Sequence, residues 1–209
     1  MSETRVIGTS GRPLSARGER TRRRLIEAAE RIFAELGYHD ASIVKLTEAA
    51  GVGHGTFYLY FSSKKEIFDE LVLDLNRRVR HAMTEASAGA VTRAEREVLG
   101  FAAFFRFTAE HPALYRIIRQ AEFVSPETLH LHYDRLTEGY VVGLREAMER
   151  GEVAEGDPEV LAWALMGIGE LVGMRWILWA GNAELPPGVA IELATIIRRA
   201  IGANGDEAP

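Results

Sequence analysis

The sequence contains no cysteine among its 209 residues. Disulfide bonds and thiolate metal sites are therefore excluded, and a reducing compartment is the simplest expectation. The first 24 residues, MSETRVIGTSGRPLSARGERTRRR, lack the apolar run of a secretory signal, and no later apolar run is long enough without interruption to be assigned to a bilayer. We expect a cytoplasmic protein without membrane contact.

Recognisable catalytic motifs are also missing. There is no nucleophile elbow and no P-loop, and the glycine pair in residues 167–169 lies in an apolar helical stretch without a preceding strand. A single Glu-x-x-His, Glu127 and His130, lies near His132 and Asp134, but helical di-iron sites need two such motifs. We expect no enzyme activity, no cofactor and no metal, with a metal at these four residues as the open alternative.

Charge is distributed unevenly along the chain, whose formal net charge is -5. Up to Lys65, 11 basic residues minus 7 acidic residues give +4, and from Glu66 onward 14 minus 23 give -9. This asymmetry favours a small nucleic-acid-binding module attached to a larger acidic one. The basic run RGERTRRR, residues 17–24, is either a DNA-contacting arm or a solvated tail.

Hydrophobic periodicity and helix punctuation predict an all-α fold of about nine helices without a strand. The expected helices cover residues 21–36, 42–50, 56–60, 63–86, 92–111, a short stretch to 123, 126–151, 158–181 and 187–201. Capping boxes are expected at Ser63 with Glu66 and at Thr92 with Glu95. We expect a basic, disordered arm at 1–19, a helix-turn-helix domain at 20–65, a ligand-binding and dimerisation domain at 66–203, and a disordered tail at 204–209.

Residues 48–61, EAAGVGHGTFYLYF, contain the parts of a helix-turn-helix. Ala49 and Ala50 are small enough for two helices to cross closely, Gly51 can adopt a left-handed turn, and Phe57 and Phe61 share one face towards the core. Hydroxyl and imidazole groups on the other faces can contact phosphates and base edges. A solvated helical hairpin is the alternative, but it leaves the outward tyrosines unexplained.

Residues 41–71, ASIVKLTEAAGVGHGTFYLYFSSKKEIFDEL, resemble the DNA-binding domain of the TetR family of bacterial regulators. The resemblance rests on the capped helix, the Ala-Gly-Val turn, the Gly-Thr-aromatic-Tyr recognition helix and the Ser-Lys pair. It implies contacts from the supporting helix, the recognition helix and a phosphate anchor, respectively Ser42, Val44 and Lys45; His54, Gly55, Thr56, Tyr58, Leu59 and Tyr60; and Lys64. Gly53 replaces a common capping Ser, so the recognition helix is expected to be loose before DNA binds.

A single recognition helix contacts few phosphates, so we expect a homodimer that reads two half-sites of double-stranded DNA about 34 Å apart or a multiple of that. Residues 160–180, VLAWALMGIGELVGMRWILWA, are apolar nearly all round, and residues 189–201 add a second apolar stripe. The resemblance also implies a four-helix dimer bundle here. We assign the interface to Leu165, Gly169, Gly173, Ile177 and Ile197; the alternative is that both helices only complete the monomer core.

Aromatic and arginine side chains alternate in residues 101–124, FAAFFRFTAEHPALYRIIRQAEFV. They could line a site for an amphipathic effector with an anionic group, such as an acyl-CoA or a fatty acid. The residues assigned to this site are Phe101, Phe104, Phe105, Arg116, Arg119 and Arg175. The alternative is an ordinary apolar core with surface or ion-paired arginines.

Together these patterns predict a transcriptional regulator, a repressor rather than an activator, that binds a palindromic operator and is released by a small molecule. Two rivals remain. One is a helical-bundle enzyme or carrier with an incidental helix-turn-helix, and the other is a DNA-binding protein that responds to no ligand.

Overall fold

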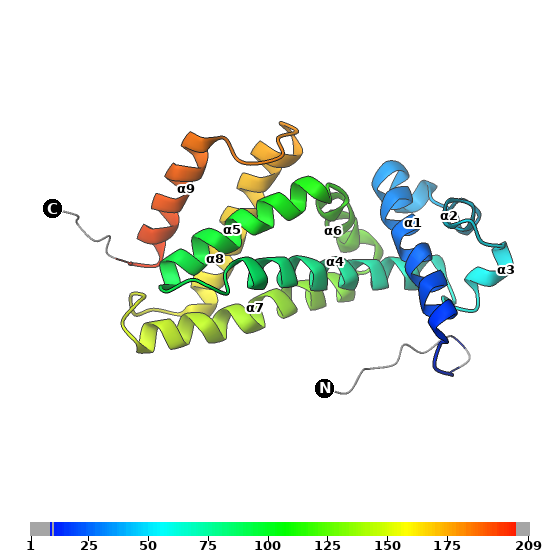
Figure 1. Cartoon of the computed structure of the whole chain (residues 1–209), viewed down its shortest axis with the longest axis horizontal. Helices are drawn as coiled ribbons and strands as arrows, with labels where there is room; N and C mark the ends of the chain where they lie inside the picture. Colours follow the sequence, from blue (N-terminus) through cyan, green and yellow to red (C-terminus); the bar gives the residue numbers. More distant parts are fainter. Residues whose placement is uncertain (1–8, 10, 204–209) are drawn as a thin grey trace. The chain divides into compact units, whose positions relative to one another are not determined.

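The computed structural model describes residue 9 and residues 11–203. In this part of the chain there are nine α-helices, one π-helical segment and no β-strand, which confirms the prediction of an all-α fold (Figure 1). The predicted tail at 204–209 and most of the predicted arm lie outside the described residues. The described end of that arm is helical rather than disordered, because Ser15 caps a helix that begins at Ala16, its Oγ accepting from Gly18 N at 3.2 Å.

The chain divides into two compact units, Met1–Leu75 with Ala113–His130, and Asn76–Pro112 with Leu131–Pro209. The predicted boundary after residue 65 therefore differs from the observed one. The first unit extends to Leu75 because α4, Lys64–Ala86, buries Phe68 against Phe33 with ring centroids 5.4 Å apart. It also includes α6, Ala113–Val124, which packs against α1, Ala16–Asp40.

Within the first unit, α1 packs against α2, Ile43–Ala50, and α2 packs against the short α3, His54–Phe57 (Figure 1). Leu25, Phe33, Leu46, Phe57 and Phe61 form its buried centre, each 1% exposed or less. Phe57 and Phe61 share the core as predicted, with ring centroids 5.7 Å apart. Gly37 interrupts α1 with φ 76°, a conformation that only glycine adopts without strain.

Both predicted capping boxes form with one contact displaced. Ser63 Oγ accepts from Glu66 N at 3.1 Å and Thr92 Oγ1 accepts from Glu95 N at 3.2 Å, as expected. The returning carboxylates accept from the residue before the cap, Glu66 from Ser62 N and Glu95 from Val91 N. The helix starts are nevertheless those predicted, because each cap satisfies an N–H group that has no partner inside its helix.

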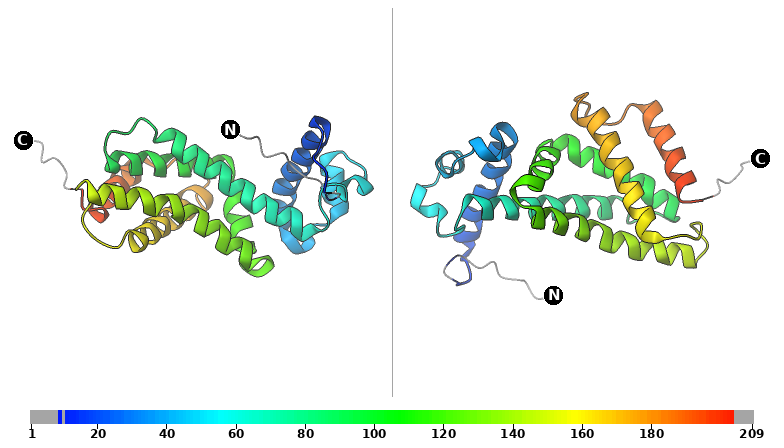
Figure 2. Two further views of the ribbon diagram at one scale, coloured as in Figure 1. Left: turned by 90° about the horizontal axis from the view of Figure 1, so that it is seen from below. Right: turned by 180° about the vertical axis from the view of Figure 1, so that it is seen from behind.

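The second unit consists of the remainder of α4, of α5, Arg93–Glu110, of most of α7, Pro126–Glu149, and of the C-terminal helices. These last are α8, Pro158–Gly173, the π-helical segment Met174–Leu178, and α9, Pro187–Ala200. Helix α5 contacts α8, the π-helical segment and α9 (Figure 2). Phe101, Phe105, Leu165, Ile177 and Ile197 form the apolar centre of this group.

Two polar groups are buried in the second unit. Arg93 and Glu97 form an ion pair at 2.6 Å, and Tyr140 donates to the same carboxylate. Burial raises the pKa of Glu97 despite the neighbouring guanidinium. Separately, His132 lies beside Asn76, with 3.2 Å between His132 Nδ1 and Asn76 Nδ2, and burial lowers the pKa of His132 to about 4.

Candidate nucleic-acid interface

Helix α2 and the turn after it adopt the geometry expected for a helix-turn-helix. Ser42 Oγ accepts from Lys45 N at 3.2 Å, which caps α2. Gly51 ends the helix in the left-handed region with φ 62° and ψ 43°, and a Cβ at this position would lie 2.9 Å from Arg24 Nη2. A glycine is therefore required both by the backbone conformation and by the neighbouring guanidinium.

Two arginines of α1 hold the C-terminal end of α2, a role that the sequence analysis missed. Arg24 Nη2 donates to Ala50 O at 2.5 Å and to Gly51 O at 3.2 Å, and Arg31 Nη2 donates to Ala49 O at 3.2 Å. These carbonyls have no partner inside α2, and a positive charge is favourable at a helix C-terminus. Arg24 and Arg31 are spaced seven residues apart on α1, the only signal that could have indicated a shared face.

The recognition helix is shorter than predicted. Helix α3 covers His54–Phe57, and residues 58–60 continue as a hydrogen-bonded turn rather than as helix. Gly53 precedes α3 without a side-chain cap, as its residue type predicted. Because glycine costs about 1 kcal/mol in a helix relative to alanine, Gly55 also weakens this turn.

The residues predicted to contact DNA lie mainly at the surface of α2 and α3. His54, Gly55 and Lys45 are exposed, and the large side chains of Val44, Tyr58 and Leu59 are 49%, 46% and 61% exposed. Ser42, Thr56 and Tyr60 are half-buried. The His54 ring rests edge-on against Tyr58, with centroids 5.6 Å apart. This surface offers imidazole, phenol and methyl groups of the kinds that contact base edges and phosphates.

Lys64, the predicted phosphate anchor, has partners inside the protein. Its Nζ donates to Tyr38 O at 2.6 Å, Ala41 O at 2.8 Å and His39 O at 3.3 Å. It also lies 4.3 Å from the Tyr38 ring centroid, and burial lowers the pKa of its ammonium group. Lys64 therefore fastens the segment between α1 and α2, and its contact with phosphate stays a prediction.

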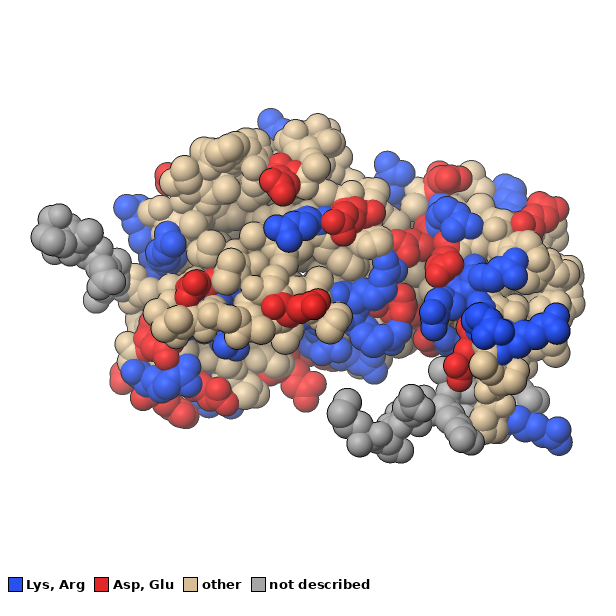
Figure 3. Space-filling model, viewed as in Figure 1, with Lys and Arg blue, Asp and Glu red and all other residues tan. Residues whose placement is uncertain are grey.

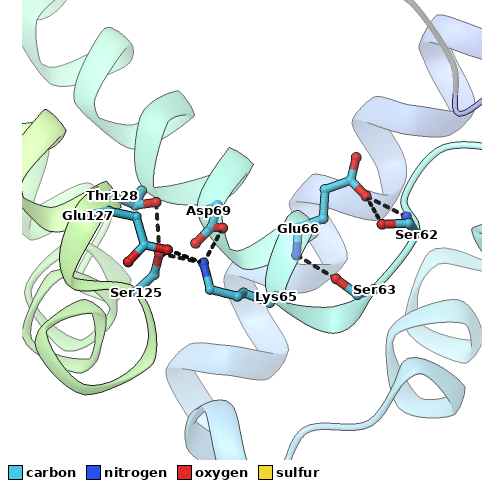
Figure 4. A network of polar contacts seen from close by, with 8 residues as sticks. All are labelled: Ser62, Ser63, Lys65, Glu66, Asp69, Ser125, Glu127 and Thr128. Atoms are coloured by element: carbon cyan, nitrogen blue, oxygen red, sulfur yellow. Dashed lines mark hydrogen bonds and ion pairs between the residues drawn. The ribbon is translucent and has the colours of Figure 1, made fainter. Parts of the chain in front are cut away.

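The neighbouring Lys65 joins the start of α4 to the start of α7 within the first unit (Figure 4). Its Nζ lies 2.8 Å from Asp69 Oδ2, 2.7 Å from Glu127 Oε1 and 2.7 Å from Ser125 Oγ. Hydrogen bonding to Lys65 lowers the pKa of Glu127 to about 2. Lys65 was not assigned a role from the sequence, and its part is structural.

The six residues assigned to the effector site are not brought together. Phe101 and Phe105 are buried in the second unit and Phe104 is half-buried there. Arg116 and Arg119 belong to α6 in the first unit, where Arg116 Nη1 donates to Ala34 O at 2.9 Å. Helix α5 ends before Pro112, and α6 then packs on α1, so the alternation of aromatics and arginines in sequence does not persist in space. The sixth residue, Arg175, is exposed beside the Trp176 ring.

The five residues assigned to the dimer interface face the interior of their own unit. Leu165, Ile177 and Ile197 are 0%, 3% and 1% exposed, and Gly173 is buried. A Cβ at Gly169 would lie 2.9 Å from Phe101 Cε1, so this glycine gives room to an aromatic ring of α5. The face assigned to the interface is therefore wrong.

The opposite faces of the same helices expose large apolar side chains. They are Val160, Trp163, Leu171, Trp179, Ile191 and Ile196, each at least 43% exposed. Among the described residues, the one helix long and apolar enough to cross a membrane by those two measures is Pro158–Leu178, of which only 33% of the most apolar window is buried. Isolated exposed apolar residues are ordinary, but a row of this kind marks an interaction surface.

The candidate metal ligands have other partners. In the described part of the chain, no group of three or more His, Asp or Glu side chains is placed to hold a metal ion. Glu127 binds Lys65, and His132 lies against Asn76.

Comparison with known proteins agrees with this geometry. Residues 25–71 match the family model described as "Bacterial regulatory proteins, tetR family". The chain is 28% identical over 193 residues to an uncharacterised HTH-type transcriptional regulator, YdgC, of Bacillus subtilis, covering 88% of this chain and 94% of that protein. It is also 28% identical over 160 residues to the fatty acid metabolism regulator protein of Bacillus subtilis, covering 74% and 82% of the two chains.

A solved structure extends the likeness to both units. Salmonella enterica GusR superposes with a TM-score of 0.75 at 26% identity, covering 88% of this chain and 96% of that one. The matched family model covers the very residues that form α2, the turn at Gly51 and α3. The chain is a helix-turn-helix transcriptional regulator and belongs to the TetR family.

Proposed function

We propose that the protein is a homodimeric, cytoplasmic repressor that binds a palindromic operator and releases it when a small amphipathic molecule binds the second unit. The observation that carries this proposal is the exposed surface of His54, Gly55, Tyr58 and Leu59 on a rigidly capped helix-turn-helix. These residues have no packing role, since the core of the first unit is formed by others.

The exposed apolar face of α8 and α9 supports dimerisation. A four-residue α3 reaches few base pairs, and a second copy doubles both the base contacts and the phosphate contacts. A two-fold axis through the apolar face would cover Trp163 and Leu171 with the same residues of the partner. The operator is then a palindrome whose half-sites are separated by about 34 Å or a multiple of that.

The nature of the effector is supported by a relative. One Bacillus subtilis protein that matches most of this chain is named a fatty acid metabolism regulator. We infer that the effector is a fatty acid or its acyl-CoA. Release follows if the ligand binds more tightly to a dimer whose two α3 helices are wrongly spaced, because a ligand shifts an equilibrium only by its differential affinity.

The DNA-binding part is tested by selecting bound fragments from random DNA with the full-length protein. The expected result is a palindrome, bound with a logarithmic affinity that falls linearly as the logarithm of salt concentration rises. His54→Ala should change the selected bases within each half-site. A protein that selects no sequence and shows no salt-dependent retention would instead support the helical-bundle enzyme or carrier.

The effector is tested on the selected operator by fluorescence anisotropy. Palmitoyl-CoA and palmitate are added separately, with free coenzyme A as the matched control. Release by either acyl compound, but not by coenzyme A, supports the proposal. Continued binding in the presence of both compounds favours a regulator that does not respond to this class of ligand.

A further inference from the structure

The start of the described chain is attached to the recognition helix. Thr9 Oγ1 donates to Tyr58 O at 2.9 Å, and Thr9 N donates to Leu59 O at 3.3 Å. These bonds join residues about fifty positions apart in sequence, at the C-terminal end of α3. Both donors of Thr9 are used, so the segment that follows Thr9 begins at a fixed point beside the surface that is predicted to enter the major groove.

The segment after Thr9 presents an arginine at this position. Gly11 has φ 72°, and a Cβ at Gly11 would have no atom within 4 Å, so the chain turns there in open space. Arg12 follows directly and is exposed. Three residues span at most about 11 Å, so the Arg12 backbone lies within that distance of Thr9 and close to the end of α3.

The arginines of the segment and of α1 form two groups. One group holds the first unit together: Arg22 pairs with Glu70 at 3.0 Å, and Arg24 and Arg31 bind the carbonyls at the end of α2. The other group is exposed, and within residue 9 and residues 11–203 its guanidinium groups make no ion pair or hydrogen bond: Arg12, Arg17, Arg20 and Arg23. Figure 3 shows Lys and Arg side chains gathered over α1.

The second group adjoins the helix-turn-helix at its other end. Arg17, Arg20 and Arg24 are spaced i, i+3 and i+7, so they share one face of α1. Arg24 fixes this face beside Ala50 and Gly51, at the turn that leads into α3. Along the axis of α1, Arg20 lies about 6 Å and Arg17 about 10 Å from Arg24.

We propose that Thr9 and residues 11–17 form a second DNA-contacting element, attached to the recognition helix by Thr9, in which Arg12 and Arg17 bind backbone phosphates beside the groove that α3 enters. The inference rests on the DNA-binding function and extends it to a segment outside the helix-turn-helix. Guanidinium groups fit phosphate because their forked N–H groups bind two oxygens at once. Such contacts position the protein and carry no base information.

The test measures operator affinity of the full-length protein as a function of salt concentration. Arg12→Gln and Arg17→Gln should each reduce the slope of log affinity against log salt by about 0.9, the value for one phosphate contact, without changing the selected sequence. Arg106→Gln is the matched control, because Arg106 is also exposed but lies on α5 in the second unit. Slopes for both variants equal to that of Arg106→Gln would overturn the proposal.

Thr9 is tested by its coupling to Arg12. Thr9→Val removes the hydroxyl that binds Tyr58 O, whereas Thr9→Ser retains it. If Thr9 positions Arg12, Thr9→Val lowers the slope as Arg12→Gln does, Thr9→Ser does not, and the double variant loses no more than either single one. Additive losses, or an unchanged slope for Thr9→Val, would overturn this role. A failure of DNA binding itself is distinguishable, since the unmodified protein would then show no salt-dependent binding.

Discussion

At the scale of single residues, charged side chains near the helix-turn-helix have structural roles that their residue types do not indicate. Lys64, Arg24 and Arg31 each donate to backbone carbonyls at helix ends. In sequence, a lysine or arginine in a DNA-binding motif is assigned to phosphate first, because phosphate contacts dominate such interfaces. The carbonyls that compete for the same donors have no signature in the sequence, so only the folded chain separates the two roles.

Replacing Lys64 with Met should reduce the stability of the protein as well as its DNA affinity. The variant keeps an unbranched side chain but loses the donors to Tyr38 O, His39 O and Ala41 O. Hydrogen bonds to a charged group contribute about 1.5 to 3 kcal/mol, so the free energy of unfolding should fall by about that amount. Lys45→Met should lose less, since its ammonium makes one such contact, with Asp40 O at 3.1 Å. An unchanged melting curve for Lys64→Met would restore a role confined to phosphate.

His132 should make stability depend on pH. It is 5% exposed, and burial, followed by the charge of Arg80, lowers its pKa from 6.5 to about 4. Below pH 6.5 the unfolded chain therefore binds a proton that the folded chain does not, so stability is full above pH 6.5 and falls as the pH decreases towards 4. The loss from this group is about 3 kcal/mol over that interval.

The measurement is urea denaturation between pH 7 and pH 4 for the unmodified protein and for His132→Gln. Carboxylates titrate in both proteins, so the difference between the two curves isolates His132. The unmodified protein should lose more stability than the variant over this range. Parallel curves would mean that His132 titrates normally in the folded protein.

At the scale of elements, helix starts were predictable because they depend on local chemistry. Ser42, Ser63 and Thr92 each accept from the N–H group three residues ahead, as their sequences indicate. The orientation of α8 was not predictable, because both its buried Leu165 and its exposed Leu171 are apolar. A helix that is apolar all round gives no periodic signal from which to assign a face.

The candidate site follows the same division. The exposed residues of α2 and α3 were identified because Phe57 and Phe61 fix one face of a short segment as core. The position of α6 was missed, since nothing local in its sequence indicates that Arg116 reaches Ala34 O, 82 residues earlier. Such contacts depend on the tertiary arrangement and not on helical periodicity.

Gly169 in α8 should not tolerate a side chain. A Cβ there would lie 2.9 Å from Phe101 Cε1 and 3.5 Å from Cδ1, inside a closely packed core. Gly169→Ala should therefore destabilise the protein by about 1 to 3 kcal/mol, the usual cost of overpacking. Gly139→Ala is the control: this position is exposed in α7, has no atom within 4 Å, and should gain up to about 1 kcal/mol from helix propensity. Thermal melts that rank the two variants in the reverse order would contradict the packing described for Gly169.

At the scale of the whole molecule, the apolar face of α8 and α9 connects assembly with DNA recognition. Leu171 is 63% exposed, on the face opposite the buried Gly169 and Gly173. If two copies pair through this face, Leu171→Glu places a carboxylate in the interface twice, once from each protomer. Burying an unpaired charge costs several kcal/mol, enough to shift a dimer towards monomer at micromolar concentration.

Sedimentation and operator binding should then change together. Leu171→Glu should sediment as a monomer and bind the palindrome with the lower affinity of one half-site, since the second set of phosphate contacts is lost. Val91→Glu is the matched control, because Val91 is 89% exposed but precedes α5 and lies on neither of the two helices. If Leu171→Glu remains as dimeric as Val91→Glu, the copies associate through another surface. If it becomes monomeric but binds the operator undiminished, then one helix-turn-helix with its arginines already supplies the measured affinity, and the palindrome would reflect two independent binding events.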